Sequence, residues 1–314
     1  MRLDEKYILI TGGAGFIGSH TAHALLEKNA RVYIIDNLSS GRKENIPPRT
    51  TFVNSNLEDN DLSKLFPNIK FDMVYHFAFN VNVPAAVRNP LIEIPSIAGS
   101  INLFEYCRNT GVKHIVFASS EFIYGNSQNF PLKESEPHDP ATPYSVSKYS
   151  VENYLHYYRK AYGMKTTIFR YSTVYGPRQI HGAMTDYIRK LSSHQQAEIW
   201  GDGEKTRDYV FIDDVVRANL LALELPERDD NVFNIGTGIE TSLNTVYSII
   251  AEELEEKASP IYHEDRSGER YRSCLDASKM FTIAGWTPKI SLKEGLHLKI
   301  QEYLKNKPAY DHYL

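Results

Sequence analysis

The feature that most constrains this chain is a glycine-rich segment, TGGAGFIG at residues 11–18, which lies between an apolar run and a helical pattern. The run at 7–11 predicts a buried strand, and apolar side chains recur at helical spacing over 15–29. The spaced glycines allow a tight turn, a close backbone approach to a pyrophosphate and close helix–strand packing. N–H groups at the start of the helix can then bind phosphate. The segment therefore predicts a dinucleotide-binding turn.

An acidic residue, Asp36, indicates which dinucleotide binds. It ends a second predicted strand at 31–36, about 20 residues beyond the glycines, where a ribose hydroxyl is bound in such folds. A carboxylate there would repel the 2′-phosphate of NADP. The sequence therefore predicts NAD as the cofactor.

The alternation of predicted elements defines the fold class. Because strands that alternate with helices need right-handed crossovers, the pattern predicts a doubly wound parallel sheet of the Rossmann type, covered on both faces. After residue 171 the alternation loosens, which indicates a smaller C-terminal α/β domain. Further strands are expected near 51–53, 72–76, 114–118 and 165–170, and helices near 57–66, 84–109 and 143–162. The predicted domains are 1–171, with 207–238 returning to it, and 172–206 with 239–314.

Composition excludes several classes of function. The net charge is −4, from 35 basic and 39 acidic residues, which is unlike the basic surface of a nucleic-acid binder. No apolar run reaches the roughly 18 residues of a membrane span, and no secretory leader is recognisable. Cys107 and Cys274 lack metal-site spacing. We expect a cytoplasmic protein without disulfides or a bound metal.

Tyr144 and Lys148 are the candidate catalytic pair, in the run YSVSK. On a helix, residues four apart share a face. A free tyrosine has a pKa of about 10, and bringing it near 7 takes about 4 kcal/mol of preferential stabilisation of the phenolate. A lysine ammonium and the positive nicotinamide ring could supply it. The alternative is an ordinary surface pair, because the chain has 21 tyrosines.

Ser120 is the third candidate, at the end of the predicted fifth strand. Ligands of doubly wound sheets bind at such strand ends. A serine there can hydrogen-bond a hydroxyl that loses its proton, although it could also cap a turn.

With these motifs in hand, the chain resembles the extended short-chain dehydrogenase/reductase family, and within it the nucleotide-sugar epimerases typified by UDP-glucose (UDP-galactose) 4-epimerase. The resemblance covers essentially the whole chain. The matching segments, in the family's order, are TGGAGFIGSH (11–20), DNLSSG (36–41), FASSEFIYG (117–125), PYSVSK (143–148), RYSTVYGPRQ (170–179), GDGEKTRDYVFIDDVVRA (201–218), NIGTG (234–238), RSGERYRSCLDASK (266–279) and GWTP (285–288).

The resemblance implies an NAD-dependent 4-epimerase of a UDP-sugar, which oxidises C4 transiently. It makes Tyr144 the base and acid, Lys148 the group that lowers its pKa and holds the nicotinamide ribose, and Ser120 an assistant in proton transfer. NAD would bind Gly12, Gly15, Phe16, Ile17, Gly18, Asp36, Asn37, Ser39, Ser40, Gly41, Asn56, Leu57, Phe77, Ala78, Tyr144, Lys148 and Tyr171. The sugar nucleotide would bind Ser120, Glu121, Thr173, Trp200, Arg207, Arg266, Glu269 and Ser273.

Individual roles also follow from the resemblance. Arg207 and Arg266 match positions that hold the substrate diphosphate, which suits planar guanidinium groups. Trp200 matches a position that packs on uracil, with a buried core tryptophan as the alternative. Ser273 matches a position near the 2-substituent of the sugar. Because serine is small, we expect room for N-acetylated sugars as well as glucose and galactose.

The chain departs from the family pattern around the sugar. Asn56 replaces an aspartate but keeps a carbonyl acceptor for the adenine amino group. Phe79 ends the run HFAF, where relatives have a small residue. Ser96 and Thr173 each replace an asparagine. These changes leave the identity of the sugar open.

Other functions stay open at this point. A 4,6-dehydratase or a decarboxylase would carry its acid two places after Ser120, where this chain has Phe122, with Glu121 one place early. A 4-keto-sugar reductase would consume NADH, and a non-catalytic NAD-binding module would not turn over at all. The helices near 84–109 and 143–162 match a dimer interface in relatives, so we also expect a homodimer. Their apolar residues include Ile92, Ile97, Leu103, Phe104, Tyr154, Leu155 and Tyr158.

Overall fold

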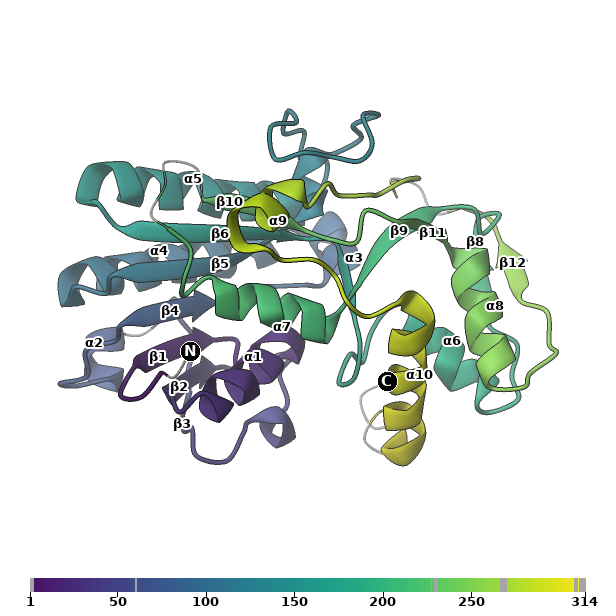
Figure 1. Ribbon diagram of the computed structural model, residues 1–314, viewed down its shortest axis with the longest axis horizontal. Coiled ribbons are helices and arrows are strands. Elements are labelled where there is room, and N and C mark those ends of the chain that lie inside the picture. Colours follow the sequence, from purple (N-terminus) through teal and green to yellow (C-terminus); the bar gives the residue numbers. More distant parts are fainter. Residues whose placement is uncertain are drawn as a thin grey trace.

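A seven-stranded sheet forms the larger part of the molecule (Figure 1). The computed structural model describes residues 3–59, 61–226, 228, 231–265, 270–307 and 310. Every strand pair in this sheet is parallel. This confirms the predicted doubly wound α/β fold. In spatial order the strands are β10 (Val232–Ile235), β6 (Lys165–Tyr171), β5 (His114–Ser120), β4 (Met73–His76), β1 (Tyr7–Thr11), β2 (Arg31–Asp36) and β3 (Thr51–Asn54).

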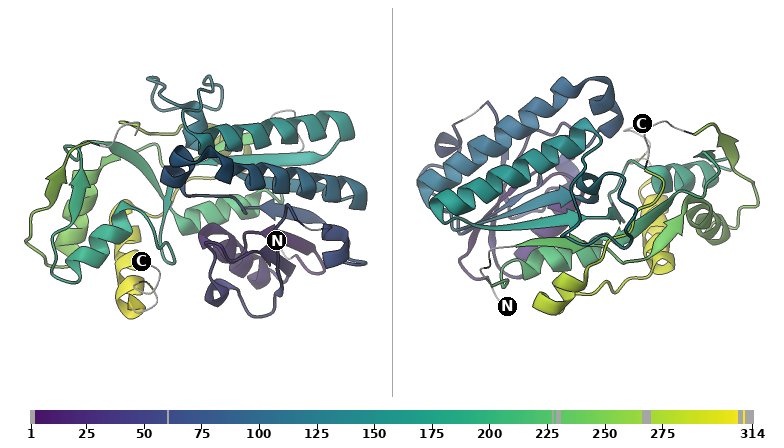
Figure 2. Two further views of the ribbon diagram at one scale, coloured as in Figure 1. Left: turned by 180° about the vertical axis from the view of Figure 1, so that it is seen from behind. Right: turned by 90° about the horizontal axis from the view of Figure 1, so that it is seen from above.

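Helices cover both faces of this sheet, as Figures 1 and 2 show. The helices α1 (Phe16–Glu27) and α7 (Ile212–Leu221) lie on one face, and α4 (Ile94–Thr110) and α5 (Pro143–Tyr162) lie on the other. In β1, Ile8 and Ile10 belong to the core under α1 and α7, whereas Leu9 belongs to the core under α4 and α5. Burial on both faces explains why β1 is a continuous apolar run.

The predicted long helix at 84–109 is broken in the structure. It consists of α3 (Val83–Arg88), the 3-10 turn η2 (Pro90–Glu93) and then α4. Pro90 lacks a backbone N–H and disfavours helical geometry at the residue before it. Asn89 is accordingly extended, and its side chain accepts a hydrogen bond from the N–H of Leu91 at 3.3 Å. The predicted helix at 57–66 is also shorter, forming only α2 (Leu62–Leu65).

A smaller lobe follows the sixth strand. It contains a three-stranded sheet, a two-stranded sheet and helices around a separate apolar core. The first sheet has β11 (Glu240–Ser242), β9 (Thr206–Phe211) and β7 (Thr173–Tyr175), and the second pairs β12 (Ile261–His263) with β8 (Glu198–Trp200). The helices are α6 (Ala183–Leu191), α8 (Leu243–Glu253) and α10 (Leu292–Lys305).

The chain passes between the two lobes several times. The predicted return over 207–238 begins later than its first residue, because β9 pairs within the small lobe, whereas α7 packs on α1 and β10 pairs with β6. A later segment returns again, since α9 (Ser278–Ala284) packs on β10 and the buried Trp286 donates from Nε1 to the carbonyl of Asp214 at 3.0 Å. The two lobes meet where β5 ends, because Glu121, directly after β5, lies near Arg207 and Asp208 of β9.

Candidate active site

The glycine turn between β1 and α1 has the geometry that a dinucleotide needs. Gly12 has a φ of +71°, and a Cβ there would lie 2.6 Å from the nitrogen of Ala78. A Cβ on Gly18 would lie 2.2 Å from the oxygen of Gly12. The helix α1 begins at Phe16, and its N-cap residue, Gly15, makes no side-chain hydrogen bond to the first turn. N–H groups of this turn, which includes Ile17, can therefore bind a phosphate. The turn fits a pyrophosphate.

Asp36 organises the residues expected around the adenosine ribose. Its buried carboxylate accepts hydrogen bonds from the N–H of Ala14 at 3.0 Å and of Leu38 at 2.8 Å. Burial raises the pKa of Asp36, and these two bonds oppose that effect. Gly41 lies against it, because a Cβ there would be 2.9 Å from Asp36 Oδ1. Carboxylate oxygens can accept further bonds, so a ribose hydroxyl is compatible with this arrangement.

Asn37 and Asn56 are joined at the same end of the sheet. Asn37 Nδ2 donates to Asn56 Oδ1 at 2.9 Å, and Asn37 Oδ1 accepts from the N–H of Ser39 at 3.0 Å, with Ser40 next in the turn. Asn56 Nδ2 donates to Asp59 at 2.6 Å. The carbonyl oxygen expected to meet the adenine amino group therefore already accepts a hydrogen bond from Asn37.

The other predicted cofactor residues lie in three different places, after β3, after β4 and at the end of β6. Phe77 and Ala78 follow β4 beside the glycine turn, where both their N–H groups donate to Thr11, at 3.0 and 3.2 Å. Leu57 is buried, and its carbonyl accepts from Asn102 Nδ2 at 2.5 Å. The side chain of Tyr171 points into the core under α1 and α7, where its hydroxyl donates to Asn219 at 2.6 Å. At the end of β6, the backbone of Tyr171 is therefore the part that can contact a cofactor.

The structure brings Ser120, Tyr144 and Lys148 together at the carboxyl end of β5. Thr142 caps α5, so Tyr144 falls in the first turn and Lys148 one turn later. Tyr144 is hydrogen-bonded to Ser120. Lys148 Nζ donates to the carbonyl of Ala118 at 2.7 Å. The three predicted catalytic side chains thus converge on one point.

Aromatic rings surround this group, which the sequence did not predict. Phe79 and Phe122 each pack edge-on against Tyr144, with centroids 6.1 Å away and interplanar angles of 86° and 87°. The Lys148 ammonium lies 3.8 Å from the centroid of Phe79 and 4.8 Å from that of Phe117. The available signal was Phe79, which stands where relatives have a small residue, and Phe122, which stands where a dehydratase or decarboxylase would carry its acid.

The pKa values of the pair lie apart in the direction set by burial. Burial raises the pKa of Tyr144 to about 12, although the hydrogen bond with Ser120 opposes this. Burial also lowers the pKa of Lys148 to about 7, against the nearby negative charges of Glu93 and Glu152. The protein alone therefore does not stabilise the phenolate, and the expected activation has to include the positive nicotinamide ring.

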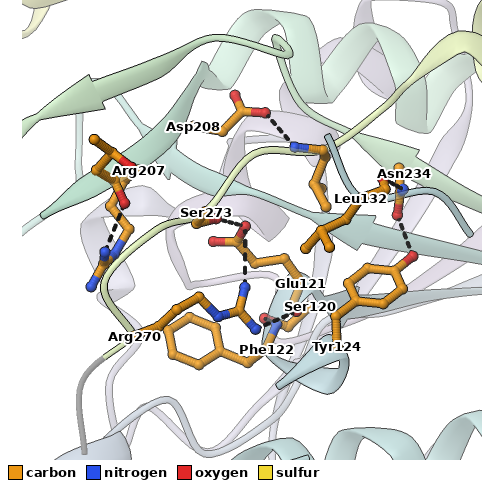
Figure 3. Close-up of polar contacts among 12 residues, drawn as sticks. Ser120, Glu121, Phe122, Tyr124, Leu132, Arg207, Asp208, Asn234, Arg270 and Ser273 are labelled. Carbon is orange, nitrogen blue, oxygen red and sulfur yellow. Dashed lines mark hydrogen bonds and ion pairs between the residues drawn. The ribbon is translucent and has the colours of Figure 1, made fainter. Parts of the chain in front are cut away.

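A polar group of three side chains lies beside Ser120 (Figure 3), formed by Glu121, Ser273 and Arg270. The Ser273 hydroxyl donates to the Glu121 carboxylate, and Arg270 Nη2 donates to the Glu121 main-chain oxygen at 3.1 Å. Burial raises the pKa of Glu121, while Arg270 is the first of the groups that oppose it. Arg207 reaches the same region from β9 and donates to the carbonyl of Thr206 at 2.7 Å. Sequence reasoning missed Arg270, although it lies in the recognised closing motif.

The remaining predicted substrate residues are spread over the smaller lobe. Thr173 begins β7 and pairs with Tyr209. Trp200 ends β8 and stacks on His263, with ring centroids 4.7 Å apart. Arg266 and Glu269 lie outside the described residues.

Asp208 is a structural residue that the sequence did not single out. Its buried carboxylate accepts hydrogen bonds from the N–H and hydroxyl of Thr237 at 2.7 and 2.6 Å. It also accepts from the N–H groups of Gly238 and Leu275, both at 3.1 Å. One side chain therefore ties β9 to the segment after β10 and to the chain beyond Ser273. No local pattern distinguishes it from other acidic residues.

Two structural features are absent from the part of the chain that the structure describes. Within those residues no helix is long and apolar enough to cross a membrane. The same residues hold no group of three or more His, Cys, Asp or Glu side chains that could bind a metal ion.

Comparison with known proteins identifies the family. The model of the NAD dependent epimerase/dehydratase family matches residues 8–236, and the chain belongs to this family. It is 36% identical over 310 residues to the UDP-glucose 4-epimerase of Mycolicibacterium smegmatis, covering 95% of this chain and 98% of that protein.

Two solved structures are similar over nearly the whole chain. The UDP-glucose 4-epimerase of Thermotoga maritima with UDP-glucose has a TM-score of 0.93 at 39% identity, covering 96% of this chain and 99% of that one. The UDP-N-acetylglucosamine 4-epimerase of Methanobrevibacter ruminantium in complex with UDP-N-acetylmuramic acid has a TM-score of 0.90 at 33% identity, with the same coverage. These matches confirm the resemblance drawn from the motifs.

Proposed function

We propose that this protein is an NAD-dependent 4-epimerase of UDP-sugars, acting on UDP-glucose and UDP-galactose and on their N-acetylated forms. The observation that carries the proposal is the convergence of Ser120, Tyr144 and Lys148 at the end of β5, beside the glycine turn. The similarity to UDP-glucose and UDP-N-acetylglucosamine 4-epimerases over almost the full chain supports it.

The residues of this group divide the work of moving a proton at the sugar. Bound NAD supplies the chemistry of accepting and returning the C4 hydride. Tyr144 takes the proton of the 4-hydroxyl, and Ser120, which is hydrogen-bonded to Tyr144, orients that hydroxyl. Lys148 holds the nicotinamide ribose and places its positive charge next to the phenol. Phe79 and Phe122 keep water away from the ring of Tyr144.

The two lobes serve the two ligands in this proposal. Residues of the large lobe around the glycine turn and Asp36 hold NAD. Residues 172–206 and 239–314, together with the strand β9, hold the sugar nucleotide, with Arg207 and Arg266 on the diphosphate and Trp200 on the uracil. Arg207 is supported by its place beside Glu121 and Arg270 at the junction of the lobes.

The geometry gives less support to a 4,6-dehydratase than to a 4-epimerase. That reaction would use an acid two places after Ser120, where the ring of Phe122 packs against Tyr144. The carboxylate that is present, on Glu121, is buried and accepts a hydrogen bond from Ser273.

The proposal is tested by turnover of purified protein with UDP-glucose and UDP-galactose. We expect interconversion of the two without net change in NADH absorbance. Tyr144→Phe should keep bound NAD and lose at least about a hundredfold in kcat, because it removes the proton acceptor. Net NADH consumption would instead indicate a reductase, and no turnover with any UDP-sugar would favour a non-catalytic module. A Tyr144→Phe rate above about a tenth of wild type would refute the assignment of the base.

Ser273 bears on N-acetylated sugars, and the structure changes how it should be tested. Its hydroxyl is bonded to Glu121, so Ser273→Tyr would displace that carboxylate as well as fill space. Ser273→Ala keeps the space and removes only the bond. We expect Ser273→Ala to retain turnover of UDP-N-acetylglucosamine and Ser273→Tyr to lose it, which separates size from hydrogen bonding.

We further propose a cytoplasmic homodimer. Val146, Tyr154 and Tyr157 are exposed along one stripe of α5, and Leu91 and Ile94 are exposed where η2 meets α4. Of the apolar residues noted in the sequence, Leu103, Phe104, Leu155 and Tyr158 are buried in the described chain, whereas Tyr154 is exposed. An exposed apolar stripe of this kind is typical of an interface. The two free, buried cysteines are compatible with a reducing compartment.

A further inference from the structure

Arg270 is held in a fixed position by Glu121 and Phe122 (Figure 3). Its Nη2 donates to the main-chain oxygen of Glu121 at 3.1 Å, and its Nη1 lies 4.0 Å from the Glu121 carboxylate. The guanidinium also lies over the ring of Phe122, 5.6 Å from the centroid. A planar guanidinium that is fixed by an acceptor, a carboxylate and a ring is preorganised for a ligand.

The two charged side chains differ in exposure. The side chain of Arg270 is 10% exposed, whereas that of Glu121 is 2% exposed. A ligand at this place would therefore meet the arginine, while the glutamate acts through it. An arginine carries five N–H donors, so the bond to Glu121 leaves donors for a ligand.

Contacts place this pair next to the catalytic group. The ring of Phe122 lies under the Arg270 guanidinium on one side and packs edge-on against Tyr144 on the other. Glu121 directly follows Ser120 at the end of β5. Arg270 is thus one side chain away from Tyr144, the proposed catalytic base.

The charged side chains around Glu121 and Arg270 affect which sugars can bind beside them. Among the described residues that act on the charge of Glu121, Arg270 and Arg207 are cations and Asp208 is a second carboxylate, and Glu121 itself is paired with Arg270. A neutral sugar leaves this balance intact. A sugar with its own carboxylate would compete with Glu121 for Arg270 and bring two like charges close together, which is unfavourable in a poorly solvated site.

We propose that Arg270 contacts the sugar of the substrate. Because the Glu121 carboxylate pairs with the positive charge of Arg270, the site prefers neutral sugars over uronic acids. Arg270 is a specificity residue, and Glu121 is a positioning residue beneath it. The inference rests on the proposed function, because it names which UDP-sugars that site accepts.

The test compares the binding of UDP-glucose with that of UDP-glucuronic acid to the NAD-loaded protein by calorimetry. In Glu121→Gln the arginine loses its partner, and we expect the ratio of the two dissociation constants to shift at least about tenfold toward UDP-glucuronic acid, or about 1.4 kcal/mol. Arg270→Gln should weaken UDP-glucose about tenfold, and the double variant should lose the gain for UDP-glucuronic acid. Thermal melting checks that each variant is folded.

A matched control is available two residues along the same segment. Arg272 pairs with Glu240 outside this group, so Glu240→Gln removes the same charge from a neighbouring Arg–Glu pair. It should leave the ratio within about twofold. An unchanged ratio in folded Glu121→Gln, or unchanged UDP-glucose binding in Arg270→Gln if Glu121→Gln does not fold, would overturn the inference. Failure of the proposed function is seen separately, as absence of UDP-glucose turnover by the wild type.

Discussion

The contact between Phe79 and Lys148 predicts a change in the pH dependence of catalysis. Replacing Phe79 by leucine keeps an apolar side chain of similar bulk and removes the ring face, which lies 3.8 Å from the ammonium. Such a contact contributes about 0.5–1 kcal/mol at exposed sites and about 2 kcal/mol where the cation is desolvated. Lys148 is buried, so the upper figure applies.

The direction and size of the change follow from this contact. The ring stabilises the charged form of Lys148, whose pKa burial already lowers to about 7. Because one pKa unit corresponds to about 1.36 kcal/mol, losing the ring should lower the pKa further, by about one to one and a half units. The reaction needs the ammonium, so the basic limb of kcat/KM should move to lower pH by that amount.

The assay is the pH–rate profile of epimerisation for wild type, Phe79→Leu and a control. Phe122→Leu is the matched control, because Phe122 makes the same edge-on contact with Tyr144 at 6.1 Å, whereas the ring closest to the ammonium belongs to Phe79. We expect the basic limb to shift in the first variant and not in the second. Equal shifts in both, or none in Phe79→Leu, would refute the role given to the ring.

The other predictions concern the cofactor, the assembly and the stability of the fold. Denaturing the purified protein should release NAD(H) and not NADP(H); recovery of NADP(H) would contradict the role of Asp36. Light scattering at micromolar concentration should show a dimer, and Tyr154→Arg should yield a monomer because it puts a charge into the exposed stripe of α5; a monomeric wild type would remove this proposal. Asp208→Asn should lower the free energy of unfolding by roughly 2–4 kcal/mol, because an amide cannot accept on both sides as the carboxylate does. Urea unfolding measures this loss, and a change below about 1 kcal/mol would show that the contacts rearrange.

Local patterns were sufficient to predict the frame of the molecule. The glycine turn, Asp36 at the end of β2 and the Tyr144–Lys148 pair on α5 are each recognisable within a few residues, because strand and helix periodicity and the demands of a tight turn are local. The break at Pro90 was also local, but the apolar spacing on both sides of it suggested one continuous helix. A single proline between two amphipathic segments should have been given more weight than their common face.

The arrangement around Tyr144 could not be predicted in this way. Phe79 comes from the end of β4, Phe122 from the end of β5 and Arg270 from the segment before α9, and only the folded chain brings them together. The same applies to Asp208, whose partners lie 29, 30 and 67 residues away. Sequence motifs predicted which residues carry catalytic chemistry, but not which neighbours control their charge.

The place of β10 in the large sheet has a consequence for synthesis of the protein. β6 ends at Tyr171, but its outer neighbour β10 begins only at Val232, after β7, α6, β8 and β9 of the smaller lobe and α7 have been made. During translation β6 is therefore an open sheet edge with the apolar residues Ile168 and Phe169, and such edges pair readily with other chains. A nascent chain halted between these two strands should be the form most prone to aggregate and most dependent on chaperones. A circular permutant in which β10 is synthesised before β6 should depend less on chaperones.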